Sequence, residues 1–108
     1  MLLHELAHCR AGDKGNTATL SVFPRDDADY ELLVRTVTAE QVRAHLAEFI
    51  AGEVVRHELP NLPALHFVCH QIVDGGVTTS LALDTHGKSL SSRLLAMEIR
   101  PAGSRTAH

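Results

Sequence analysis

The sequence predicts a two-layer α+β domain in which a mostly antiparallel sheet carries helices on one face. Two observations lead to this prediction: apolar and polar residues alternate as in strands at 17–23 and 65–73, and a well-marked amphipathic helix lies between these segments. A chain of 108 residues fits a single domain. Its hydrophobic content of 44% and charged content of 21% are those of an ordinary globular protein.

The first part of the chain is expected to form a strand, a loop and a second strand. Residues 2–7 are interpreted as a short opening strand. Residues 9–16 are expected to be a loop, because two glycines and an aspartate lie within eight residues. Residues 17–23 then alternate as a half-buried strand does, before Pro24 ends it. The residues expected to face the core are Ala18, Leu20 and Val22.

The best-marked element is a helix over 39–51, preceded by a short helix that Asp26 and Asp27 can cap. Thr38 and Gln41 have the spacing of a capping box at its start. A C-terminal stop is expected at Gly52. The helix carries one apolar stripe at i, i+4, i+7 and i+8, and the stripe consists of Val42, Leu46, Phe49 and Ile50.

The second half of the chain is expected to complete the sheet and add a last helix. Short alternating runs separated by Pro and Gly predict antiparallel strands and turns. The expected elements are strand 53–59, strand 65–73, turn 74–76, strand 79–84 and helix 89–97, with 97–100 as an alternative closing edge strand. The domain is expected to span 1–100, followed by a polar, flexible tail at 101–108.

Composition argues against several classes of protein. The net charge of −3 provides no broad basic face for nucleic acid, and aromatic residues are only 4%. No apolar run reaches the roughly 18 residues of a membrane helix, and the N-terminus does not have the pattern of a signal peptide. Cys9 and Cys69 do not form a disulfide framework, so both are expected to be reduced thiols. We therefore expect a cytoplasmic protein without a cofactor.

A zinc-protease motif is matched by residues 4–8, HELAH. In that motif two histidines on a helix bind zinc and the glutamate activates water. The helix could hardly extend here, because Gly12 and Gly15 follow at once. On a strand, His4 and His8 would share a face while Glu5 points to the other. We expect no metal site, and a zinc-dependent hydrolase using His4 and His8 is the least favoured function.

A second cluster, residues 66–70, combines two histidines with a cysteine. On a strand, Cys69 points away from His66 and His70, so the three side chains cannot bind one metal ion together. Cys69 is expected to be a small core residue.

The segment 10–16 is the main candidate for a binding site. Glycines allow close approach to a backbone whose N–H groups could hold an anion, and two cations lie beside them. Phosphate-loop spacings are missing. The alternative is a purely structural connection between two strands. The candidate ligand- or partner-binding residues are Arg10, Gly12, Asp13, Lys14, Gly15 and Asn16.

Three segments stand out when they are taken together: 11–16 (AGDKGN), 58–65 (ELPNLPAL), and 75–99, which begins with GGV and ends with LAMEI. Their combination resembles one known family, the AtuA-like ferredoxin-fold domain. The resemblance covers about residues 3 to 99, and Ala11 stands where most relatives have Ser. It implies a ferredoxin-like fold, found in this family at the C-terminus of larger AtuA-type proteins or as a separate small protein. AtuA is associated with bacterial use of acyclic terpenes.

The resemblance and the small size favour an accessory or interaction subunit without catalysis of its own. Its expected partner is a large AtuA-like chain or a second copy of itself, in a bacterial catabolic pathway for acyl or terpenoid compounds. The alternative is a domain that binds a small anionic ligand, such as an acyl-CoA, at 10–16. Neither nucleic acid nor membrane is an expected partner.

Overall fold

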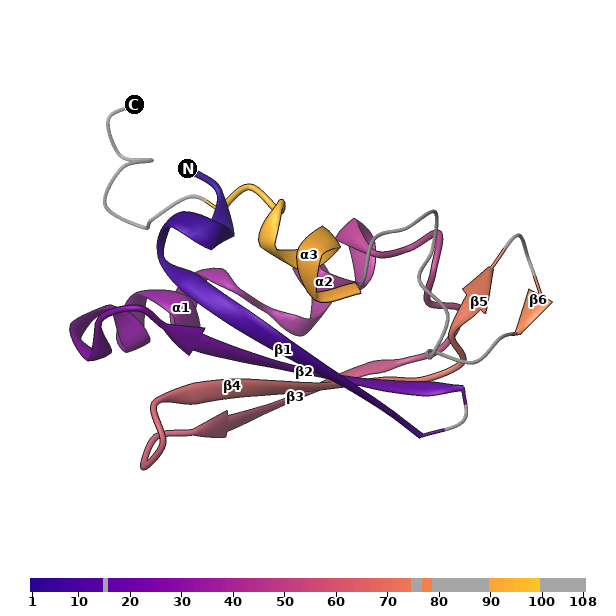
Figure 1. The fold of residues 1–108 in the computed structure, drawn as a ribbon, viewed down its shortest axis with the longest axis horizontal. Coiled ribbons are helices and arrows are strands. Elements are labelled where there is room, and N and C mark those ends of the chain that lie inside the picture. The colour runs from indigo at the N-terminus through magenta and orange to yellow at the C-terminus, as the bar shows by residue number, and fades with distance from the viewer. Residues whose placement is uncertain (15, 75–76, 79–89, 100–108) are drawn as a thin grey trace.

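The computed structural model describes residues 1–14, 16–74, 77–78 and 90–99, with the backbone alone for 13, 14, 74, 77 and 78. Strands and helices follow one another as two hairpins with helices between and after them (Figure 1). The elements are a 3₁₀ turn η1 (Leu3–Glu5), β1 (Ala7–Lys14), β2 (Thr17–Pro24), a 3₁₀ turn η2 (Asp27–Asp29), α1 (Tyr30–Thr36), α2 (Ala39–His45), β3 (Val54–Leu59), β4 (Ala64–Cys69), β5 (Val73–Asp74), β6 (Val77–Thr78) and α3 (Leu90–Leu95).

The main sheet has four strands in the order β1-β2-β4-β3, and every neighbouring pair is antiparallel. Since β2 and β3 both run antiparallel to β4, they are parallel to each other and are joined through α1 and α2. If β1 followed α3 in the chain, the order of the elements would be βαββαβ, which is the order of the ferredoxin-like fold. The helices lie on one side of the sheet (Figure 1). The predicted two-layer α+β fold is confirmed.

The core lies between the helices and one face of the sheet. In β2 the residues alternate between half-buried and buried, as the sequence predicted for 17–23. The stripe predicted on the second helix is also buried. The fully buried side chains with the largest volumes include Leu20, Leu33, Val42, Leu46, Leu65, Phe67 and Leu94.

The capping box predicted at Thr38 and Gln41 is present, whereas Asp26 caps the 3₁₀ turn η2 and not α1, which has no side-chain cap. The second helix is shorter than expected. Asp26 accepts a hydrogen bond from the Ala28 N–H at 3.0 Å, and Thr38 accepts one from the Gln41 N–H at 3.1 Å. Helix α2 ends at His45 rather than at residue 51, because the chain then turns to join β-structure: Ile50 forms a bridge with Ile72. The predicted boundary was wrong, whereas the predicted buried stripe was right.

Gly52 is required by a close backbone contact and is not a helix stop. Its N–H donates to the carbonyl of His70 at 3.1 Å, and an added Cβ would lie 2.7 Å from that oxygen. The predicted strand 65–73 ends nearby, since β4 stops at Cys69 and Gln71 has a positive φ of 57°. This local reversal interrupts the alternation and lets Ile72 enter the core.

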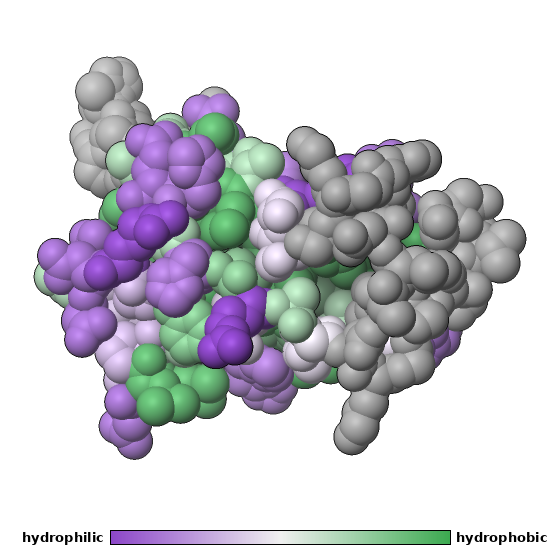
Figure 2. Space-filling model, viewed as in Figure 1, coloured by the Kyte–Doolittle hydropathy of each residue, from purple (hydrophilic) through white to green (hydrophobic). Residues whose placement is uncertain are grey.

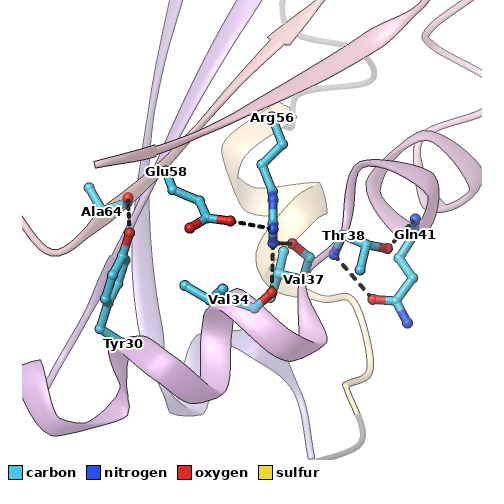
Figure 3. A network of polar contacts seen from close by, with 8 residues as sticks. All are labelled: Tyr30, Val34, Val37, Thr38, Gln41, Arg56, Glu58 and Ala64. Atoms are coloured by element: carbon cyan, nitrogen blue, oxygen red, sulfur yellow. Dashed lines mark hydrogen bonds and ion pairs between the residues drawn. The ribbon is translucent and has the colours of Figure 1, made fainter. Parts of the chain in front are cut away.

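An arginine fastens the end of α1 to the sheet (Figure 3). Nη1 of Arg56, on β3, donates to the carbonyls of Val34 and Val37 at 2.7 and 3.0 Å, and Nη2 pairs with Glu58 at 2.9 Å. The Tyr30 hydroxyl donates to the carbonyl of Ala64 at 3.2 Å. The two bonds from Nη1 of Arg56 satisfy carbonyl groups that the end of α1 leaves without partners.

The C-terminal part agrees with the predicted helix at 89–97, because α3 covers Leu90–Leu95. The alternative prediction was an edge strand at 97–100. The described residues there form an isolated bridge between Glu98 and Leu2 in place of a strand. The predicted strand 79–84 and the tail 101–108 lie outside the described residues.

Candidate functional site

The segment predicted as a binding loop is mostly strand. Residues up to Lys14 belong to β1, which pairs with β2 in unbroken register from Ala7↔Pro24 to Lys14↔Thr17. Only residues 15 and 16 connect the strands. Glycine and charged residues misled the loop prediction, because an edge strand with one exposed face tolerates both. Gly12 fits here for a steric reason: an added Cβ would lie 2.8 Å from Oγ1 of Thr19.

The candidate residues are therefore spread along a hairpin rather than gathered in a cradle. Arg10 and Gly12 are exposed on β1, opposite Ser21 and Thr19. Asn16 is exposed, and its carbonyl accepts a hydrogen bond from the Ile72 N–H at 2.8 Å. Asp13 and Lys14 contribute backbone to β1, while their side chains and all of Gly15 lie outside the described part. The binding role of these residues stays a prediction.

The side of the sheet that faces away from the helices carries the most notable group of polar residues. We call this side the open face, because the helices lie on the other side of the sheet (Figure 1). Among the side chains described on it, Ala64 at the start of β4 is buried and the others are half-buried or exposed. Directly paired positions on antiparallel strands share a face, so the register assigns its members. The members described with their side chains are His8, Arg10, Gly12, Thr17, Thr19, Ser21, Phe23, Val55, His57, Leu59, Ala64, His66 and Val68.

One row of the open face is polar across all four strands. Arg10 pairs with Ser21, Ser21 with His66, and His66 with His57. We call these four residues the polar row. Directly opposite residues have Cβ atoms about 4.5–5.5 Å apart, so neighbours in the row can act on one ligand group. Arg10 and His57 are exposed at the two edges, and the middle pair is half-buried.

The two central side chains of the polar row are held together. Oγ of Ser21 and Nδ1 of His66 share a hydrogen bond of 2.9 Å. This bond orients the imidazole and leaves Nε2 for another partner. The ring centroids of His57 and His66 are 6.4 Å apart. The arrangement offers a guanidinium, a hydroxyl and two imidazoles to a ligand, which is the chemistry of anion recognition.

Less polar side chains flank the polar row on both sides. On one side the next row runs through Thr19, Val68 and Val55. On the other, the rings of His8 and Phe23 stack with centroids 5.4 Å apart. The open face therefore combines apolar and polar side chains, as surfaces that contact another protein do.

The HELAH segment does not form the metalloprotease arrangement. His4 and Glu5 lie in the 3₁₀ turn η1, where the sequence predicted a strand, and His8 is the second residue of β1. The strand prediction for 2–7 failed because Glu5 accepts a hydrogen bond from the Leu2 N–H at 2.9 Å, which closes a turn. Among the described residues no three His, Cys, Asp or Glu side chains group as metal ligands.

The cysteines behave as core residues. Cys69 is fully buried while His66, three residues earlier, lies half-buried on the open face, so the predicted opposition of the two side chains is confirmed. Burial raises the pKa of the Cys69 thiol to about 11. Burial, and then the charge of Cys69, raises the pKa of Cys9 to about 12. Both thiols are protonated at neutral pH and are weak nucleophiles.

A groove of about 570 Å³ lies on the helix side of the sheet, between α2 and β3. Its charged lining residues are Glu40, Arg43 and Glu53, and Nε of Arg43 already donates to the carbonyl of Gly52 at 2.9 Å. With two carboxylates and one engaged guanidinium, this groove does not favour an anionic ligand. The polar row is the better candidate.

Arg10 and His66 stand out separately in the sequence, but Ser21 and His57 do not stand out as their neighbours. Strand alternation places Ser21 on the polar side of 17–23 and His66 opposite Cys69. That signal was available in the sequence. The register between strands was not, because residues 45 positions apart meet in the Ser21–His66 hydrogen bond.

A four-stranded antiparallel sheet with helices on one face defines a small α+β domain of the ferredoxin-like type. A family model, the AtuA ferredoxin-like domain, matches residues 1–100, and the chain belongs to this family. Searches of curated proteins and of solved structures found no match. Within the described residues, no helix has the length and apolar character needed to cross a membrane.

Proposed function

We propose that the chain is a small accessory or interaction subunit that associates, through its open face, with a large AtuA-like chain or with a second copy of itself. The observation that carries this proposal is that the helices cover only one side of the sheet (Figure 1). The family resemblance supports a role in a bacterial catabolic pathway for acyl or terpenoid compounds, in the cytoplasm. The proposal assigns no catalysis to the chain itself.

Apolar surface at one end of the sheet also supports a contact role. The β3–β4 turn exposes Leu62 by 67% and Leu59 by 37%. Figure 2 shows green, apolar surface at the lower left, where this turn lies. Exposed leucines at the end of an uncovered sheet are suited to a protein contact.

Co-expression with a large AtuA-like chain, followed by purification and light scattering, tests the proposal. Val68→Glu places a charge among the half-buried residues of the open face and should weaken the complex. Ala44→Glu places the same charge on the exposed part of α2 and serves as the matched control. A chain that remains monomeric at all concentrations and does not bind the large chain would contradict the proposal.

The second candidate function is binding of a small anionic ligand, such as an acyl-CoA, centred on 10–16. The observation that favours it is the exposed Arg10 beside the Ser21 hydroxyl. Arg10→Gln and Lys14→Ala should then weaken acyl-CoA binding while leaving the melting temperature almost unchanged. If Lys14→Ala changes neither acyl-CoA binding nor partner binding, residues 10–16 have a structural role only.

A further inference from the structure

The charge of the open face differs from that of the whole chain. The sequence has 13 acidic residues against 10 basic ones, giving a net charge of −3. Yet the described open-face residues include one arginine and three histidines and no acidic side chain. Exposed acidic residues lie elsewhere, for example Asp26 and Asp27 before α1 and Glu40 on α2. The open face is therefore complementary to an anionic surface.

The polar row also has the dimensions of a contact with several carboxylates. Four neighbouring strands place its ends roughly 14 Å apart, since strands lie about 4.8 Å from each other. Arg10 is at one edge and His57 at the other, with the hydrogen-bonded Ser21–His66 pair between them. A row of this length suits an extended acidic segment better than a single small anion.

We propose that the open face docks an acidic, carboxylate-bearing surface of a partner protein through Arg10, Ser21, His66 and His57, and that protonation of the two histidines strengthens the contact. This inference rests on the proposed interaction function and specifies the chemistry of the partner. The titratable groups described on the face are Arg10, His8, His57 and His66, contributed by β1, β3 and β4.

The distance between the two imidazoles provides the physical reason for the pH dependence. Imidazole is the ordinary side chain whose charge changes between pH 5 and 8. The two ring centroids lie 6.4 Å apart, so one acidic segment can reach both rings. A carboxylate bound beside an imidazole stabilises its protonated form. Binding should therefore become tighter as the pH falls through this range.

The first experiment needs only the purified chain and a synthetic probe. Imidazole proton signals are followed by NMR from pH 5 to 8, with and without a deca-glutamate peptide and in the presence of EDTA. We expect the titration midpoints of His57 and His66 to move to higher pH with the peptide, while exposed His4 in η1 remains unchanged. A deca-glutamine peptide should have no effect. Midpoints that do not move with deca-glutamate would overturn the inference.

The second experiment uses the complex with the large AtuA-like chain. Wild-type affinity should be roughly three- to tenfold higher at pH 6 than at pH 8, the range that two exposed ion pairs allow. The double variant His57→Gln/His66→Asn should remove this difference between the two pH values. The single variant His57→Gln changes an exposed side chain and keeps the Ser21–His66 hydrogen bond, so it tests His57 without disturbing that bond. His4→Gln is the control. Arg10→Gln should weaken binding at both pH values and reduce its salt dependence.

The outcomes separate this inference from the proposed function. If no complex forms at any pH, the proposed interaction function fails. If a complex forms but responds neither to pH nor to these variants, the interaction function stands and the acidic-partner inference is overturned. If binding tightens only with added zinc and is lost in EDTA, the histidines bind a metal ion, which also overturns the inference.

Discussion

Nη1 of Arg56 lies 2.7 Å from the carbonyl oxygen of Val34 and joins the edge strand β3 to the last turn of α1. The same nitrogen donates to the carbonyl of Val37 at 3.0 Å. A cation at a helix C-terminus is favourable both as a hydrogen-bond donor and through the helix dipole. This single side chain therefore connects the two layers on the helix side of β3 (Figure 3).

Replacing Arg56 should destabilise the fold. Arg56→Leu leaves two carbonyl groups without their donor, and we expect a loss of roughly 1–3 kcal/mol in the free energy of unfolding. Urea denaturation measures it. Glu58→Gln is the control, since its partly exposed ion pair with Arg56 contributes about 0–1 kcal/mol. Equal stability of wild type and Arg56→Leu would show that water satisfies the carbonyls equally well.

Truncating Leu46 tests the buried stripe that extends past the end of α2. Leu46 is 1% exposed, so Leu46→Ala removes a core side chain and should cost roughly 2–5 kcal/mol. Glu48→Ala, at a neighbouring exposed position, should stay within about 0.5 kcal/mol of wild type. A loss below about 0.5 kcal/mol for Leu46→Ala would place this residue outside the core.

The two close-contact glycines should respond differently to alanine. At Gly52 the added methyl group meets the His70 carbonyl at 2.7 Å, so backbone must shift and Gly52→Ala should cost roughly 1–3 kcal/mol. At Gly12 it meets the Thr19 side chain, which can rotate away. Gly12→Ala should therefore cost less, and Thr19→Ala should relieve the cost. Thermal melts of the single variants and of the double variant Gly12→Ala/Thr19→Ala measure these losses. If Thr19→Ala does not restore the stability of Gly12→Ala, this account of Gly12 is contradicted.

Alkaline pH should destabilise the protein through its thiols. The pKa of Cys69 is about 11 in the folded chain against an ordinary 9.0, so above pH 9 the unfolded state releases its proton first. The contribution of the protonated Cys69 thiol to the free energy of unfolding is fully present below pH 9. It falls by up to about 2–3 kcal/mol as the pH rises towards 11.

Urea denaturation at pH 8, 9.5 and 10.5 under reducing conditions measures this loss. Cys69→Ala should flatten the dependence over this range. The pKa of Cys9 is raised in the same direction, so the variant that lacks both thiols should be flattest. An unchanged slope in the double variant would assign the alkaline loss to other groups.

The sequence by itself determined the local elements and the side of each element that enters the core. Alternation in 17–23 and the stripe from Val42 to Ile50 both report burial directly, and the Thr38–Gln41 capping box is a local signal read within four residues. These features depend on neighbours along the chain, which is why they could be predicted. Family membership was equally accessible, because three short segments carry its pattern.

Only the tertiary structure decided where strands end and which residues meet. The glycine- and charge-rich segment 9–14 looked like a loop, yet pairing with β2 makes it a strand. The helix predicted to residue 51 stops at His45, because Ile50 bridges to Ile72. The polar row exists only through register, since Arg10, Ser21, His57 and His66 come from four strands. Turn geometry sets the register within each hairpin, but the pairing of β2 with β4 joins Ser21 to His66 across 45 positions and depends on the packing of the whole sheet.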